Sequence, residues 1–203
     1  MCWRIWFIGV LLFCTDSYIM SQDRGTIYKL ENGIYVAAVN VRFESCHAQQ
    51  QNENWCWAAC VEMVLKYQNV NISQKEIVER AFGADGNVTA NGADIVRAAS
   101  GWYYNGTYIN AKQEHLKSVT SMIDDLAYHY PIIIGLKDGY QGDIGHAYVL
   151  THIYYRIDVS GNVSPFKVVL IDPWITGDQE KVIDWNDFYK RITTIVHVYR
   201  VEY

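Results

Sequence analysis

The sequence contains few charged residues and no cluster of positive charge. Only 19% of its 203 residues are charged, the formal net charge is −5, and no run of lysine or arginine occurs. A protein that binds nucleic acid irrespective of base sequence needs a basic surface stripe, so we expect no nucleic-acid partner. Half of the residues are apolar, which excludes a disordered chain and indicates a globular one.

The chain also lacks internal repeats, low-complexity tracts and linkers. It contains only 3 prolines, and no Pro/Gly-rich stretch divides it. A length of 203 residues suits one well-packed domain and is barely enough for two. We therefore expect a single domain over residues 23–203, preceded by a separate N-terminal segment.

The apolar run near the N-terminus is too short to cross a membrane, which takes about 20 residues. It extends from Ile5 to Cys14, with Arg4 before it and the polar residues Thr15–Ser17 after it. This order is typical of a secretory signal peptide. The sequence thus predicts a signal peptide over residues 1–22 and a secreted or periplasmic protein. Lipid attachment at Cys14, an uncleaved anchor and a buried N-terminal helix are the alternatives.

Cysteines are few, and loss of the leader leaves Cys46, Cys56 and Cys60. An odd number in an exported protein implies one pair and one free thiol. We expect a Cys46–Cys60 disulfide in an oxidising compartment, which leaves Cys56 free. Zinc ligation by these cysteines with His47 is an alternative, but the spacings match no common zinc finger or ribbon, so we expect no metal.

Apolar periodicity predicts a helical first half. From Trp55 to Tyr67 apolar residues recur every three or four positions, the pattern of a helix that buries one face, with Asn54 as its N-cap. Three further helices are predicted over residues 73–82, where Ser73 is the cap, 94–99 and 115–128.

The second half favours strands. Segments rich in β-branched residues predict strands over residues 131–136, 146–155, 166–171 and 192–201, and short extended segments lie at 26–30 and 34–37. The turn residues Ser160–Asn162 join the second and third of these strands into a hairpin. Helices followed by strands predict an α+β domain, with an N-terminal helical lobe packed on a C-terminal antiparallel sheet.

Cys56 combines with residues of the hairpin in a pattern that suits thiol catalysis. It stands at the start of the first predicted helix, where unpaired N–H groups and the helix dipole favour a thiolate. Cys60, inside the same helix, is a weaker candidate for the nucleophile. His146 begins one strand of the hairpin and Asp172 ends the other, so the two can meet as an imidazole and the carboxylate that orients it.

Gln50 precedes Cys56 by six residues, which lets its amide reach back and donate to an oxyanion. Gln49 and Gln51 flank it, so Gln50 is chosen by spacing alone. The remaining histidines (His47, His115, His129, His152 and His197) are interpreted as structural, packed or exposed. Asp124 and Asp125 are interpreted as a solvated helix face, and Trp174 as a shield over the His146–Asp172 pair.

The block Gln50-x5-Cys56-Trp57-Ala58 resembles the papain-like cysteine peptidases. Gly145-His146-Ala147 and Ile171-Asp172-Pro173-Trp174 are similar to its compact bacterial branch, which includes the AvrRpt2-like (C70) and C39-like peptidases. The resemblance covers residues 45–175. It implies a helical lobe that bears the cysteine and a β-rich lobe that bears the histidine and its partner. Classical papains have asparagine as that partner, whereas this chain has Asp172, as the C39-like branch does.

The resemblance implies hydrolysis of peptide bonds. Cys56 is then the nucleophile, His146 the base, Asp172 its orienting group and Gln50 an oxyanion donor together with the Cys56 backbone N–H. The substrate is a protein or peptide, and no metal or cofactor is required. The same residues suit an amidase or a transferase that acts on another amide, and a catalytically silent peptide-binding domain is the non-enzymatic alternative.

Overall fold

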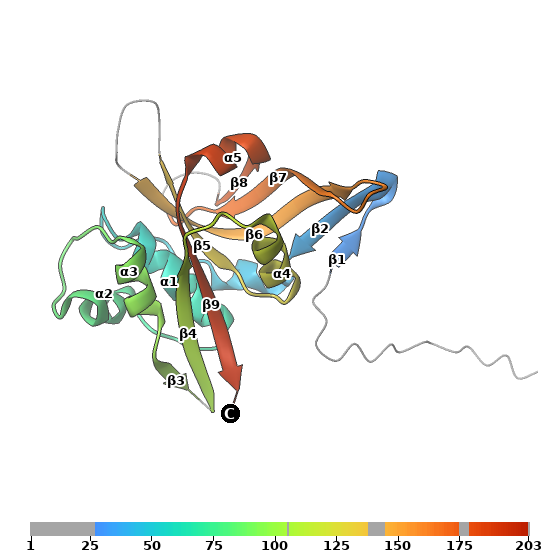
Figure 1. The fold of residues 1–203 in the computed structure, drawn as a ribbon. Helices are drawn as coiled ribbons and strands as arrows, with labels where there is room; N and C mark the ends of the chain where they lie inside the picture. Colours follow the sequence, from blue (N-terminus) through green and yellow to red (C-terminus); the bar gives the residue numbers. More distant parts are fainter. Residues whose placement is uncertain (1–26, 105, 138–144, 175–178, 203) are drawn as a thin grey trace, which may run out of the picture.

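The computed structural model describes residues 27–104, 106–137, 145–174 and 179–202 (Figure 1). The predicted signal peptide over residues 1–22 lies outside these ranges and stays a prediction. Within them, no helix is both long enough and apolar enough to cross a membrane. The elements are, in order, β1 (Ile27–Lys29), η1 (Glu31–Gly33), β2 (Ile34–Ala38), η2 (Val41–Cys46), α1 (Cys56–Tyr67), α2 (Gln74–Phe82), α3 (Gly92–Ala99), β3 (Trp102–Tyr104), β4 (Thr107–Glu114), α4 (Val119–Ala127), β5 (Ile132–Lys137), β6 (Gly145–Ile157), β7 (Val163–Ile171), β8 (Glu180–Asp184), α5 (Trp185–Arg191) and β9 (Ile192–Glu202).

One antiparallel sheet of nine strands organises the described chain. Its main path is β1-β2-β6-β5-β9-β4-β3, and β7 pairs with β6 and β8 off this path. The first part of β6 pairs with β5 and its later part with β2, while β7 pairs along the other edge of β6. The predicted hairpin is therefore confirmed as the β6–β7 pair. The two extended segments near the N-terminus are strands of the same sheet.

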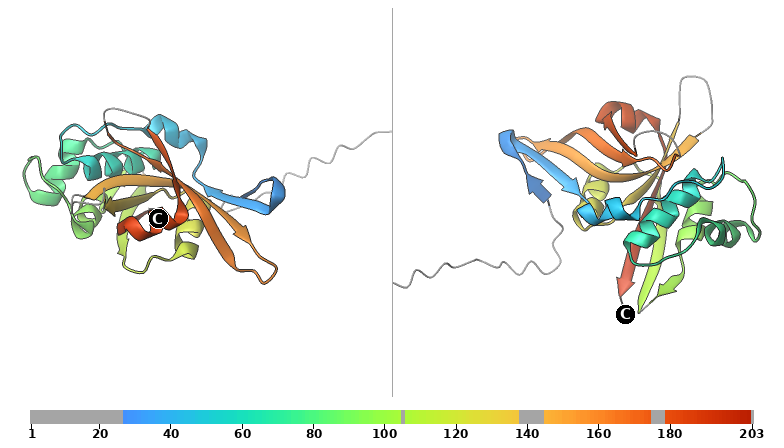
Figure 2. Two further views of the ribbon diagram at one scale, coloured as in Figure 1. Left: turned by 90° about the horizontal axis from the view of Figure 1, so that it is seen from above. Right: turned by 180° about the vertical axis from the view of Figure 1, so that it is seen from behind.

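Helix α1 lies at the centre of the protein. Nine of its twelve residues are buried, so it is enclosed on nearly all sides and does not bury a single face as the sequence predicted. It packs against β5 and β6, and α2 and α3 pack against α1. Figure 2 shows this helical group on one side of the sheet and α4 on the other. Together these layers confirm the predicted α+β class.

Local signals placed some element ends correctly and missed others. Ser73 caps α2 in a full capping box with Glu76, as predicted. The predicted helix over residues 115–128 begins later, because Ser118 caps α4 through the N–H of Ser121. Thr107–Glu114, before the predicted helix, form β4, a strand that the prediction missed although its buried and exposed positions largely alternate. The elements β3, β8 and α5 were missed as well.

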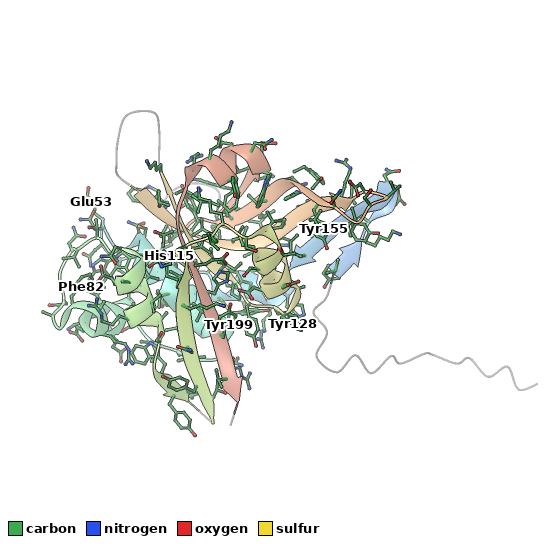
Figure 3. All side chains as sticks on the ribbon, viewed as in Figure 1. Glu53, Phe82, His115, Tyr128, Tyr155 and Tyr199 are labelled. Carbon is green, nitrogen blue, oxygen red and sulfur yellow. The ribbon has the colours of Figure 1, made fainter. Side chains whose placement is uncertain are left out.

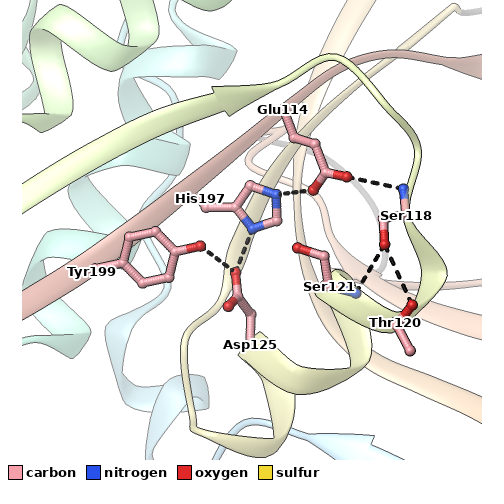
Figure 4. Close-up of polar contacts among 7 residues, drawn as sticks. All are labelled: Glu114, Ser118, Thr120, Ser121, Asp125, His197 and Tyr199. Carbon is pink, nitrogen blue, oxygen red and sulfur yellow. Dashed lines mark hydrogen bonds and ion pairs between the residues drawn. The ribbon is translucent and has the colours of Figure 1, made fainter.

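A buried polar cluster ties α4 to strands β4 and β9 (Figure 4). His197 is fully buried, and its Nε2 lies 2.7 Å from Glu114 Oε2. Its Nδ1 pairs with Asp125 Oδ2, which also accepts a hydrogen bond of 3.1 Å from the Tyr199 hydroxyl. The interpretation of Asp125 as solvated was therefore wrong, while Asp124 is exposed. The sequence showed only a helical position and not the histidine beneath it.

Replacement of His197 by leucine should destabilise the fold strongly. The leucine would remove the ring that both carboxylates, of Glu114 and Asp125, share in a mostly buried setting, and loss of one partner of a buried ion pair costs about 3–5 kcal/mol. The free energy of unfolding, measured in urea, checks this expectation. His115→Leu, at an exposed position, is the matched control and should change stability little. Equal stability of the two variants would contradict a stabilising role for the cluster.

Candidate active site

Cys56 is the first residue of α1 and is a half-buried, free thiol. The predicted cap Asn54 was wrong. The N-cap residue is Trp55, whose side chain makes no capping hydrogen bond. Asn54 bonds to Asn87 instead. The first turn of a helix has N–H groups without acceptors inside the helix. With no side-chain cap on them, these groups are left to favour negative charge at Cys56.

The two tryptophans beside Cys56 hold it in place. Both are buried, and their indole N–H groups donate to backbone carbonyls of one loop. Trp55 Nε1 lies 2.7 Å from Gly86 O and Trp57 Nε1 lies 3.0 Å from Val88 O. The helix start therefore cannot rotate without loss of both bonds.

His146 lies at the beginning of β6 and faces both Cys56 and Asp172. Its Nε2 donates to Asp172 Oδ1 over 2.8 Å, which leaves Nδ1 for the thiol side. Burial of the ring lowers the pKa of His146, but hydrogen bonds with Asp172 and Cys56, together with their charges, outweigh it and raise this pKa to about 9. Rings of Tyr148 and Trp174 pack edge-on against the imidazole, with centroids at 4.7 and 5.9 Å.

Asp172 directly follows β7 and is buried, with only 4% of its surface exposed. Its Oδ1 also accepts the backbone N–H of Trp174 at 2.9 Å, and Lys181 Nζ lies 2.5 Å from Oδ2. Burial raises the pKa of Asp172, but the hydrogen bonds from His146, Lys181 and Trp174 outweigh it and lower this pKa to about 2. The carboxylate is therefore ionised and held by three donors.

Gln50 is the one of the three consecutive glutamines that is buried. Its Nε2 donates to the carbonyls of Asn52 at 3.0 Å and Glu53 at 2.8 Å. Figure 3 shows Glu53 on the side of the helical lobe. The Gln50 backbone N–H donates to Pro173 O at 2.8 Å, which joins this loop to the segment that carries Asp172. Both hydrogens on the side-chain Nε2 of Gln50 are thus engaged within its own loop.

Gln74 holds the peptide groups on both sides of Gln50, a contact that the sequence did not suggest. It is fully buried on α2. Its Nε2 donates to Gln49 O at 2.8 Å and to Glu62 Oε2 at 2.7 Å, and its Oε1 accepts the Gln51 N–H at 2.9 Å. The side chain therefore fixes the loop before Cys56 against α1. A polar residue at the start of a capped helix is too common a signal to have identified it.

The other cysteines are not paired with each other. Cys46 and Cys60 are free and buried, so the expected Cys46–Cys60 disulfide is wrong. Cys46 Sγ instead donates to Arg42 O, one turn earlier in η2. Burial, with smaller effects of Cys56 and Asp172, raises the pKa of Cys60 well above its usual value. That burial makes Cys60 a poor nucleophile.

Three other residues that were interpreted from the sequence lie in different settings. His47 was interpreted as structural, and its Nε2 donates to the carbonyl of Asp172 at 3.3 Å. His152 contacts the hydroxyl of Thr151, and burial lowers its pKa. Trp174 is 46% exposed, and its ring packs edge-on against the His146 imidazole. Among the described residues, no group of three or more histidine, cysteine or acidic side chains is arranged to hold a metal ion.

A central helix that begins with a cysteine and packs on an antiparallel sheet that carries a histidine defines the papain-like cysteine peptidase fold. A family model described as Peptidase_C39 like family matches residues 41–199. The chain therefore belongs to the Peptidase_C39 like family, and the predicted fold class is confirmed. Neither this match nor the structural one below concerns the C70 branch.

The fold is similar to that of a solved bacterial peptidase domain. The peptidase domain of Streptococcus ComA, a bi-functional ABC transporter involved in a quorum sensing pathway, superposes with a TM-score of 0.51. The two chains are 17% identical, and the match covers 77% of this chain and 97% of that domain. At this identity the likeness concerns the fold alone. No curated protein matches the sequence significantly.

The charge state of His146 should be measurable directly. We expect its ring to titrate near pH 9 in an NMR experiment on the side-chain nitrogens, with His146→Ala used for assignment. Asp172→Asn should lower this midpoint by about 1–3 pH units, because the negative charge beside the imidazolium is lost. An unchanged midpoint in Asp172→Asn would contradict the role assigned to the carboxylate.

The same pair sets the pH range in which it stabilises the fold. Because the pKa of His146 is raised, its contribution is complete below its usual value of 6.5 and is lost as the pH rises through about 9. Because the pKa of Asp172 is lowered, its contribution is present above its usual value of 3.8 and is lost as the pH falls through about 2. Both contributions to the stability of the fold are therefore complete together between pH 3.8 and 6.5.

Proposed function

We propose that this protein is a cysteine peptidase with Cys56 as nucleophile. The observation that carries the proposal is the chain of contacts from Cys56 to His146 and from His146 to Asp172. A nucleophile, a base and a group that orients the base are the parts that thiol catalysis needs. The family assignment supports a peptidase-type domain, and such a domain acts on a peptide or protein substrate.

The proposed reaction is acyl transfer in two steps. The Cys56 thiolate attacks the peptide carbonyl carbon, a C–S bond forms, and the carbonyl electron pair moves onto oxygen. When this intermediate collapses, the C–N bond breaks and imidazolium His146 gives its proton to the leaving amine. Neutral His146 then takes a proton from water, and the resulting hydroxide attacks the thioester. When this second intermediate collapses, the C–S bond breaks, the carboxylic acid product leaves, and thiolate Cys56 and imidazolium His146 are restored.

The oxyanion needs donors that point to it in the transition state. The backbone N–H of Cys56, in the uncapped first turn of α1, is one such donor. In this proposal Gln50 is the second. Its Nε2 must then exchange one of its bonds, to Asn52 O or Glu53 O, for a bond to the oxyanion. Because Gln74 holds the peptide groups on both sides of Gln50, this exchange needs a movement of the Gln50 side chain and no displacement of the backbone.

Covalent labelling tests the identity of the nucleophile. The intact protein is treated with iodoacetamide or an epoxide probe, and the modified cysteine is mapped by mass spectrometry. We expect preferential labelling of Cys56, which is lost in His146→Ala because the imidazolium partner is removed. A peptide library should be cleaved by the native protein and not by Cys56→Ala. Labelling of Cys46 or Cys60 instead, or no labelling, would overturn the proposal.

The library also separates the alternatives. Labelled Cys56 without cleavage of any peptide would point to an amidase or transferase that acts on another amide, and binding of peptides without cleavage to a silent domain. Either result would overturn peptide hydrolysis.

Gln50→Ala should lower kcat by about 10²–10³ with little change in KM, because a donor to the oxyanion acts mainly in the transition state. Steady-state kinetics with a cleaved peptide measures this effect. Gln51→Ala, at an exposed neighbouring position, is the matched control and should leave kcat unchanged. Labelling of Cys56 in Gln50→Ala shows whether the loop is intact. An unaltered kcat in Gln50→Ala would remove Gln50 from the mechanism.

A further inference from the structure

Lys181 contacts the oxygen of Asp172 that His146 does not use. Its Nζ lies 2.5 Å from Oδ2, whereas Oδ1 accepts from His146 and from the backbone of Trp174. The carboxylate therefore stands between an imidazole on one side and an ammonium group on the other. Two cations that share one carboxylate divide its charge between them.

The strand β8 places Lys181 at this position. β8 pairs with β7, with Lys181 opposite Leu170 and Glu180 opposite Ile171. The backbone continues this pairing one step further, because the N–H of Asp172 donates to Gln179 O at 2.7 Å. The register of an edge strand thus fixes the lysine beside the carboxylate. No sequence spacing near the Asp172 motif indicated it.

Lys181 also approaches the other support of the imidazole. Its Nζ lies 5.2 Å from the centre of the Tyr148 ring, and that ring packs edge-on against His146. Among the described residues, the titratable groups that face the Asp172–His146 pair are Cys56 and Cys60 from α1, His47 from the loop after η2, Tyr148 from β6 and Lys181 from β8. Of these groups, only Lys181 forms an ion pair with the second carboxylate oxygen, Oδ2.

Because Asp172 is a charged partner of His146, the cation of Lys181 on its other oxygen affects the acidity of the imidazolium. A full negative charge stabilises the imidazolium more than a neutral amide does, and a strongly stabilised imidazolium is a poor acid. In the proposed mechanism His146 must give its proton to the leaving amine. A cation on the far side of Asp172 weakens the hold of the carboxylate on that proton without removing the hydrogen bond that orients the ring.

We propose that Lys181 is a positioning residue that orients the Asp172 carboxylate and offsets part of its charge, so that imidazolium His146 can release its proton. The catalytic consequence rests on the proposed function, but the charge effect does not. Lys181 has a half-exposed side chain on an edge strand, and exposed ion pairs contribute little to stability. Its substitution should therefore leave the fold intact.

Three substitutions separate charge, hydrogen bonding and packing at Lys181. Lys181→Arg keeps the charge and the donor, Lys181→Gln keeps a donor without charge, and Lys181→Met keeps only the length. The NMR titration of His146 needs no substrate and is the main readout. Removal of a nearby cation should raise the midpoint by about 1 pH unit in the Met and Gln variants. Lys181→Arg should titrate close to the native protein.

Lys167→Met is the matched control. Lys167 is a lysine of the neighbouring strand β7 whose Nζ lies over the Tyr154 ring at 3.8 Å, so its loss removes the same charge without contact to Asp172. It should leave the midpoint unchanged. A native midpoint in Lys181→Met or in Lys181→Gln, or an equal shift in Lys167→Met, would overturn the inference.

Kinetics completes the test on the proposed reaction. With a cleaved peptide, the alkaline limb of the pH profile of kcat/KM should move to higher pH in Lys181→Met, by the same shift as the NMR midpoint. An NMR shift with an unmoved alkaline limb would overturn the catalytic consequence. If no peptide is cleaved by the native protein, the proposed function fails, while the titration still decides whether Lys181 offsets the charge of Asp172.

Discussion

The antiparallel pairing of β6 is the constraint on which the structure depends. This strand of 13 residues pairs with β5 and β2 along one edge and with β7 along the other, and α1 packs against it. Its register with β7 brings the start of one strand to the end of the other, so His146 meets Asp172. Contact with α1 brings Cys56 to the same place. Backbone hydrogen bonds thus establish the geometry that the side-chain contacts then complete.

Two histidines are held by carboxylates in this protein, with opposite consequences. His197 is fully buried and both its ring nitrogens face carboxylates, so neither nitrogen is left for a reacting group. His146 gives one nitrogen to Asp172 and turns the other side of its ring to Cys56. Burial and the number of partners therefore distinguish a histidine that ties elements together from one that can transfer a proton.

Sequence reasoning succeeded where the signal is local. The apolar spacing that follows Cys56 predicted α1, and the turn at Ser160–Asn162 predicted the hairpin that joins His146 to Asp172. It failed where the partner comes from elsewhere in the chain. The solvated position given to Asp125 ignored a histidine 72 residues away. A sequence carries no periodicity that reveals such pairs.

The sequence by itself determined that a helix begins within one residue of Cys56, that strands end near His146 and Asp172, and hence the α+β class. These features follow from periodicity and turn chemistry, which act between residues close together in the chain. Only the tertiary structure decided that Gln74 holds the loop of Gln50 and that Lys181 lies on the free oxygen of Asp172. Such contacts depend on sheet register and helix packing, which bring together residues that the chain itself keeps apart.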